Sequence, residues 1–90
     1  MTSPETKLLV FGATWCGPCK ALAPVIEKVS KRYPSIQVSK IDVEENSELA
    51  TKYHVQNLPK LVVEKNGKVV NEHTGYLSEE RIIEALNLDT

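Results

Sequence analysis

The chain has 90 residues, of which 41% are hydrophobic and 26% charged, a balance typical of one soluble globular domain over residues 1–90. A formal net charge of −1 and a pI near 6.1 offer no basic surface to nucleic acid or to an acidic membrane. No apolar run approaches the roughly 20 residues of a membrane-spanning helix, and residues 1–6 carry no basic region followed by an apolar stretch. We therefore expect a cytoplasmic protein without membrane or nucleic-acid partners.

The first half of the chain predicts a strand, a helix and a second strand. Residues 8–11 form a short continuous apolar run, which is typical of a central strand buried on both faces. After a turn, helical periodicity runs from Cys16 to about Tyr33, and Pro24 should kink this helix without ending it. Residues 36–42 alternate as a strand. The apolar helix positions are Leu22, Val25, Ile26, Val29 and Tyr33.

The second half predicts a short helix, a hairpin and a last helix. A helix over residues 48–54 can be capped by Asn46 or Ser47. Asn66-Gly67 joins two β-rich runs, residues 60–65 and 68–74, and is a strong hairpin signal. The last helix is expected to begin at a Ser78 cap and to bury Ile82, Ile83 and Leu86.

This order of elements, β-α-β-α-β-β-α, indicates an α/β fold with a mixed four-stranded sheet and helices on both faces. The first two strands, joined through a long helix, should be parallel with a right-handed crossover. The last two should form an antiparallel hairpin. Residues that follow the first strand then lie beyond its carboxyl end, where open α/β sheets place their sites.

The candidate site lies there, since residues 15–20 read Trp-Cys-Gly-Pro-Cys-Lys and contain the only two cysteines, Cys16 and Cys19. A helix N-terminus carries unpaired N–H groups and partial positive charge, which stabilise a thiolate over a thiol. Two intervening residues allow the second sulfur to reach the first. The pattern therefore predicts a dithiol that cycles between reduced and disulfide forms.

Two other interpretations of the cysteine pair are weaker. A structural disulfide that closes so short a loop would stabilise the fold very little. A zinc ion normally takes four ligands and would need both His54 and His73, which lie far along the chain. Redox chemistry is therefore favoured and no metal is expected.

With these motifs in place, the chain resembles the thioredoxin family over most of its length. The resemblance rests on the Trp-Cys-Gly-Pro-Cys-Lys segment, Pro24, Asp42 at a strand end, Leu58-Pro59, the Lys-Asn-Gly-Lys hairpin and Gly75. It implies a thiol–disulfide oxidoreductase that reduces protein disulfides. It also implies the thioredoxin-like three-layer fold, here without the strand and helix that usually precede residues 8–11.

The resemblance also implies roles for individual residues. Cys16 is expected to be the more exposed sulfur and the nucleophile that forms a mixed disulfide, and Cys19, more buried, to resolve it. The Leu58-Pro59 bond is expected to be cis, with Leu58 offering backbone groups to an extended substrate. The implied substrate-binding residues are Trp15, Gly17, Pro18, Leu58, Pro59, Gly75 and Tyr76.

Two substitutions depart from the family pattern. Thioredoxins usually carry a buried Asp six residues before the first cysteine, where this chain has Val10. Because Val cannot accept the proton of Cys19, we expect slower resolution of the mixed disulfide. Lys60 follows Pro59 where Thr is common, and it can favour acidic substrates.

The family further implies no bound cofactor, electrons from an NADPH-dependent thioredoxin reductase, protein disulfides as substrates, and a monomer. One alternative is a glutaredoxin-like reductase recycled by glutathione, although Gly-Pro between the cysteines argues against it. The other is a binding or accessory subunit that uses the same surface. Such a subunit would tolerate Cys16→Ser, whereas an enzyme would not.

Overall fold

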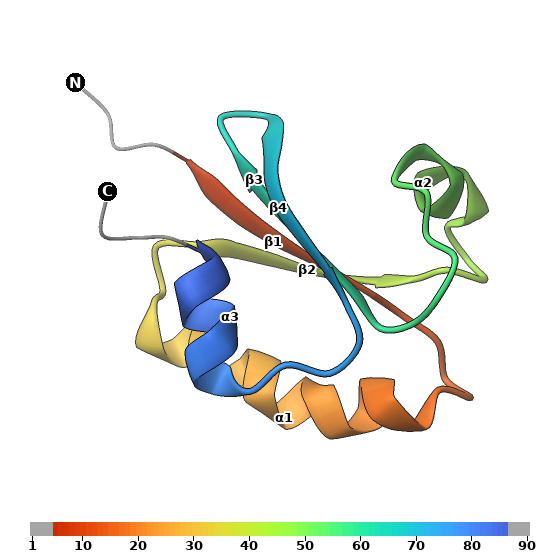
Figure 1. Cartoon of the computed structure of the whole chain (residues 1–90), viewed down its shortest axis with the longest axis horizontal. Helices are drawn as coiled ribbons and strands as arrows, with labels where there is room; N and C mark the ends of the chain where they lie inside the picture. The colour runs from red at the N-terminus through yellow and green to blue at the C-terminus, as the bar shows by residue number, and fades with distance from the viewer. Residues whose placement is uncertain (1–4, 87–90) are drawn as a thin grey trace.

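The computed structural model describes residues 5–86 and has the element order that the sequence predicts. Figure 1 shows the arrangement. The elements are β1 (Thr6–Gly12), α1 (Gly17–Arg32), β2 (Gln37–Asp42), α2 (Ser47–Lys52), β3 (Lys60–Lys65), β4 (Lys68–Thr74) and α3 (Glu79–Leu86).

The four strands form one mixed sheet in the order β2-β1-β3-β4. β1 runs parallel to β2 and antiparallel to β3, and β3 pairs antiparallel with β4. β1 is longer than the apolar run because its end residues also pair, Thr6 with Lys65 and Gly12 with Asp42. The predicted parallel and antiparallel pairings are confirmed.

The core has two parts, one on each face of the sheet. The larger part joins the sheet to α1 and α3, which lie together on one side of the sheet in Figure 1. Its buried residues are Leu8, Leu22, Ile26, Val29, Ile36, Leu61, Val63, Ile82 and Leu86. The smaller part, Leu9, Phe11 and Val62, packs against residues around and after α2, which itself has no buried residue. Helices therefore lie on both faces, but α2 contributes little to the core.

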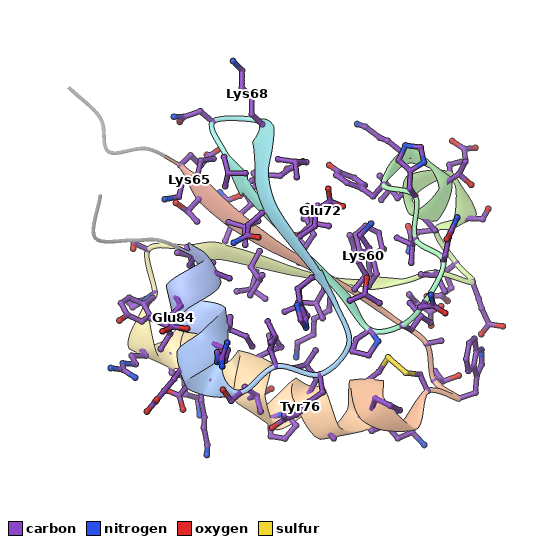
Figure 2. All side chains as sticks on the ribbon, viewed as in Figure 1. Lys60, Lys65, Lys68, Glu72, Tyr76 and Glu84 are labelled. Carbon is purple, nitrogen blue, oxygen red and sulfur yellow. A yellow bond between two sulfur atoms is a disulfide. The ribbon has the colours of Figure 1, made fainter. Side chains whose placement is uncertain are left out.

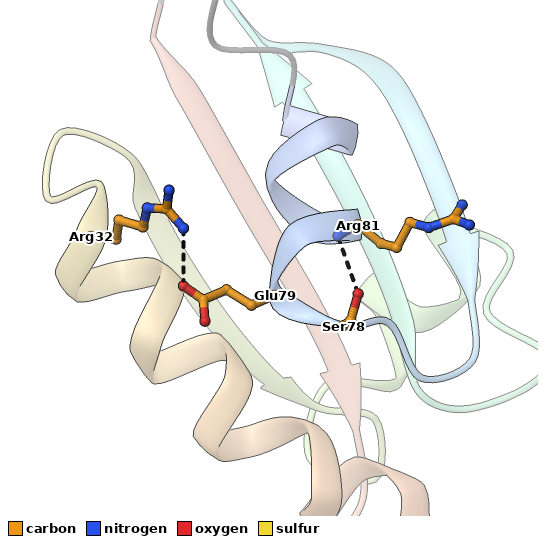
Figure 3. A network of polar contacts seen from close by, with 4 residues as sticks. All are labelled: Arg32, Ser78, Glu79 and Arg81. Carbon is orange, nitrogen blue, oxygen red and sulfur yellow. Dashed lines mark hydrogen bonds and ion pairs between the residues drawn. The ribbon is translucent and has the colours of Figure 1, made fainter.

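Polar contacts tie the two helices of the larger core together at their ends. Arg32 in the last turn of α1 forms an ion pair of 3.4 Å with Glu79 in the first turn of α3 (Figure 3). The Ser78 hydroxyl accepts a hydrogen bond of 3.3 Å from the N–H of Arg81, which confirms Ser78 as the predicted cap.

The helix bounds follow the predictions closely except in α2. α1 continues through Pro24 as predicted. α2 was expected over residues 48–54, but it begins at Ser47 and ends at Lys52. The chain leaves the helix because His54 adopts a left-handed conformation with φ 55°. Asn46 stands at the cap position, yet its side chain donates to the Asp42 carbonyl at 3.0 Å and caps nothing.

The hairpin between β3 and β4 turns at Asn66 and Gly67, as predicted. Both have positive φ, 54° and 82°, which suits the right-handed twist of the two strands. The turn is tied to the start of β1 by a hydrogen bond of 2.9 Å from the Asn66 N–H to the Glu5 carbonyl. Among residues 5–86, no helix is both long enough and apolar enough to cross a membrane.

Candidate active site

The two cysteines lie at the N-terminal end of α1, directly beyond the carboxyl end of β1 (Figure 2). They are joined by a disulfide, and their Cα atoms are 5.3 Å apart. A turn closed by a 3.2 Å hydrogen bond from the Cys16 N–H to the Ala13 carbonyl leads from the strand into the helix. The strand and the helix start therefore position the pair.

The electrostatic setting of the two sulfurs differs. Cys16 is the N-cap residue of α1, and its Sγ accepts a 3.2 Å hydrogen bond from the Cys19 N–H. Pro18 in the first turn has no N–H to donate, and the first turn of α1 contains no acidic residue. The helix N-terminus therefore stabilises negative charge on Cys16, as a nucleophilic thiolate requires.

The exposure of the two cysteines is the reverse of the expectation. Cys16 is 5% exposed and Cys19 is half-buried, so the prediction that Cys16 is the more exposed is wrong. The physical reason lies in Gly12, because a Cβ there would stand 3.3 Å from the Cys19 Sγ. Without a side chain at this position, the space beside Cys19 stays open.

Cys16 opens instead onto a hollow of about 580 Å³. Four of the predicted substrate-binding residues line it, namely Trp15, Gly17, Pro18 and Leu58. Trp15 is 67% exposed and forms part of the rim. The hollow therefore brings the helix start together with the segment that precedes β3.

Four further lining residues were missed in the sequence: Val43, Val55, Gln56 and Asn57. The last three directly precede Leu58, so chain continuity was a usable signal. Val43 was harder to predict because it follows β2 and lies near the site only because β2 pairs with β1. Its N–H donates to the Gly12 carbonyl at 3.0 Å, just beyond the ends of the parallel pair β1 and β2.

The Leu58-Pro59 peptide bond is cis, as predicted. Pro59 is buried, and its carbonyl accepts a 2.7 Å hydrogen bond from the N–H of Gly75, which has a positive φ of 106°. Pro59, Gly75 and the exposed Tyr76 do not line the hollow beside Cys16. The structure thus joins Gly75 to Pro59, which directly follows Leu58 at the hollow.

Lys60 does not present a free charge to the site. Its side chain is buried, and its Nζ lies 2.8 Å from the Tyr53 carbonyl and 2.9 Å from a carboxylate oxygen of Glu72. Figure 2 shows Lys60 and Glu72 on the side of the sheet near α2. The expectation that Lys60 favours acidic substrates therefore loses its basis.

The other candidate residues lie outside the dithiol site. His54 and His73 are exposed, and within residues 5–86 no three or more His, Cys, Asp or Glu side chains are grouped to hold a metal ion. Lys40, on the outer strand β2, is exposed and lies 3.7 Å from a carboxylate oxygen of Glu27. The cysteine pair is thus the reactive centre on this surface.

Comparisons with known proteins agree with this geometry. The family model described as Thioredoxin matches residues 1–88. Thioredoxin from Staphylococcus epidermidis is 43% identical over 82 residues, 90% of this chain and 79% of that protein. Thioredoxin from Bacillus subtilis is 42% identical over 87 residues, 96% of this chain and 84% of that protein.

A solved structure gives the same result. The crystal structure of Fasciola hepatica thioredoxin superposes with a TM-score of 0.87 at 36% identity, covering 92% of this chain and 79% of that one. With its Cys16–Cys19 pair at the start of α1, the chain belongs to the thioredoxin family and is a thiol–disulfide oxidoreductase that reduces protein disulfides.

Proposed function

We propose that Cys16 is the attacking sulfur of this reductase. In the reduced protein its thiolate attacks a substrate disulfide, forms a mixed disulfide and expels the substrate's other sulfur as a thiolate. Cys19 then attacks the Cys16 sulfur, which releases the reduced substrate and restores the protein disulfide. The observation that carries this assignment is the N-cap position of Cys16 with the 3.2 Å hydrogen bond from the Cys19 N–H.

The proposed substrate surface extends from Trp15 across Gly17 and Pro18 to Leu58 and Pro59. Two features support it: the hollow of about 580 Å³ beside Cys16, and an apolar Trp15 ring that is 67% exposed. Among the described residues, the loop backbone hydrogen bonds include none from Leu58. Its backbone groups are therefore free to pair with an extended substrate segment. The proposal also includes Gly75 and Tyr76, which adjoin Pro59 through the Gly75 hydrogen bond.

The proposed electron source is an NADPH-dependent thioredoxin reductase, and the proposed substrates are proteins with accessible disulfides. The protein would act as a monomer in the cytoplasm, as a single domain over residues 1–90, without nucleic-acid or membrane partners. Recycling by glutathione and a role as a binding subunit are the competing proposals. The family match favours the reductase over both.

Insulin reduction with dithiothreitol as the electron source tests the proposal. Wild type should accelerate insulin precipitation and Cys16→Ser should lose all acceleration. Cys19→Ser should accumulate a mixed disulfide with substrate on Cys16, identified by peptide mass spectrometry. Equal activity of Cys16→Ser and wild type would contradict the assignment. Adding either thioredoxin reductase with NADPH or glutathione then identifies the electron source.

A further inference from the structure

Residues 55–58, which lie between α2 and β3, are buried at their ends and exposed in their middle. Val55 and Leu58 are half-buried and pack against the smaller part of the core. Gln56 and Asn57 lie between them, and both are exposed. The chain therefore presents two polar residues on a short segment whose two ends are held by the core.

Backbone hydrogen bonds also fix the ends of this segment. The Val55 N–H donates a hydrogen bond of 2.8 Å to the Ala50 carbonyl in α2. At the other end, Leu58 is followed by the buried Pro59, whose carbonyl accepts a 2.7 Å hydrogen bond from the Gly75 N–H. A segment that is ordered before a ligand arrives loses little conformational entropy when the ligand binds.

The two polar residues line the hollow beside Cys16. No charged side chain lines this hollow, and Gln56 and Asn57 supply its only amide side chains. Within residues 5–86, neither amide side chain has a hydrogen-bond partner in the protein, and no loop backbone hydrogen bond involves residues 56–58. Two amides beside the disulfide are therefore free to bind a ligand.

We propose that the side-chain amides of Gln56 and Asn57 bind the main chain of the substrate segment that carries the disulfide. This inference rests on the proposed attack by Cys16, and it adds the chemistry that is recognised, an extended peptide bound through its peptide groups. Each amide has an NH₂ donor and an oxygen acceptor. It can therefore pair with the carbonyl or the N–H of a peptide unit, whatever side chain that unit carries.

The two amides act on binding and not on disulfide exchange. The charge of the Cys16 thiolate is stabilised by the helix N-terminus and the Cys19 N–H, and neither depends on Gln56 or Asn57. A contact that is equally strong before and during the reaction changes the half-saturation concentration and leaves the maximal rate unchanged. A small disulfide without a peptide main chain gains nothing from these contacts.

Two variants that keep side-chain size but remove the amides test the proposal. They are Gln56→Met and Asn57→Leu, alone and combined. Gln37→Met is the matched control, since Gln37 is exposed at the start of β2 and does not line the hollow. The reduced protein is mixed with increasing insulin, quenched with acid and separated by chromatography, which gives the rate of insulin reduction at each concentration.

The half-saturation concentration of insulin should rise about three-fold in each single variant and about ten-fold in the double variant, as expected for one and two lost hydrogen bonds. The maximal rate should stay within about two-fold of wild type, and the control should match wild type in both quantities. Reduction of 5,5′-dithiobis(2-nitrobenzoate), which has no peptide main chain, should be unchanged in every variant. Equal slowing with this reagent would show a disturbed Cys16 and would overturn the proposal.

A binding measurement separates this inference from the proposed function. In ¹⁵N-labelled protein with Cys16→Ser and Cys19→Ser, added insulin should shift the side-chain amide NMR signals of Gln56 and Asn57 but not that of Gln37. Because this readout needs no reduction, failure of wild type to reduce insulin would refute the proposed function alone. Unshifted signals, or an unchanged half-saturation concentration in the folded double variant, would overturn the inference.

Discussion

Lys60 on β3 and Glu72 on β4 form an ion pair of 2.9 Å in which only the lysine is buried. The two side chains are 10% and 51% exposed. The Lys60 Nζ also donates a hydrogen bond of 2.8 Å to the Tyr53 carbonyl, just after α2. One ammonium group therefore joins the hairpin to the end of α2.

We predict that Lys60→Met lowers the free energy of unfolding by about 1–3 kcal/mol, because it leaves the Tyr53 carbonyl and Glu72 without their partner. Glu72→Gln should cost less, about 1 kcal/mol or below, because Glu72 is half exposed and solvent screens its charge. Urea unfolding followed by circular dichroism measures both. A larger loss for Glu72→Gln than for Lys60→Met would contradict this assignment.

The surroundings of Tyr53 predict a loss of stability at alkaline pH. A hydrogen bond to the Glu64 carboxylate, burial and the negative charge of Glu64 raise the Tyr53 pKa above its usual value near 10. Below pH 10 the phenol is protonated in both folded and unfolded states, so this contribution to stability is complete. Above pH 10 the unfolded state ionises first, so stability falls as pH rises towards the folded pKa.

We therefore predict that the loss of unfolding free energy between pH 9 and pH 11 is smaller in Tyr53→Phe than in wild type. Tyr76→Phe is the matched control, since Tyr76 is exposed, and it should follow wild type. Urea unfolding over this pH range gives the comparison. Identical pH dependence of Tyr53→Phe and wild type would refute the role of the Tyr53–Glu64 bond.

Val10 gives a test of proton transfer from Cys19. It is half-buried, lines the same hollow as Cys19 and pairs in register with Lys40 on β2. We predict that Val10→Asp speeds the resolution step about ten-fold or more, because a carboxylate there can take the Cys19 proton. Val10→Asn, which is similar in size but cannot act as a base, should not.

The reduced protein mixed with 5,5′-dithiobis(2-nitrobenzoate) resolves the two steps in time. The first equivalent of thionitrobenzoate reports the initial attack, and the second reports resolution. The advantage of Val10→Asp over wild type should hold from pH 6 to pH 8, because a carboxylate with an ordinary pKa near 4 is ionised throughout this range. A second phase of Val10→Asp that is no faster than that of wild type across this range would show that the missing carboxylate does not limit resolution.

Leu22 anchors α1 in the larger core and is fully buried. We predict that Leu22→Ala lowers the free energy of unfolding by about 2–5 kcal/mol, the range for removing a buried Leu side chain. Lys28→Ala on the exposed face of the same helix should stay within about 0.5 kcal/mol. Chemical denaturation of both variants makes the comparison. Equal losses would mean that the burial of Leu22 does not set its contribution to stability.

Local signals explain why most of the fold could be predicted. The Asn66-Gly67 turn needs positive φ at two successive residues, and few dipeptides other than Asn-Gly adopt it readily. Likewise, the periodicity of α1 marks its buried face whatever the helix packs against. The end of α2 was missed because the left-handed turn at His54 has no comparable sequence signal.

The features of the site likewise fall into two groups, those set by neighbouring residues and those set by contacts between separate elements. The sequence by itself determined that a dithiol stands at a helix N-terminus after a central strand, because both elements are encoded by neighbouring residues. Only the tertiary structure decided which cysteine is the more exposed residue, that Lys60 is held by Tyr53 and Glu72, and that Val43 lines the site. These depend on contacts between separate elements, such as Gly12 against Cys19, and no local pattern in the chain records what will pack there.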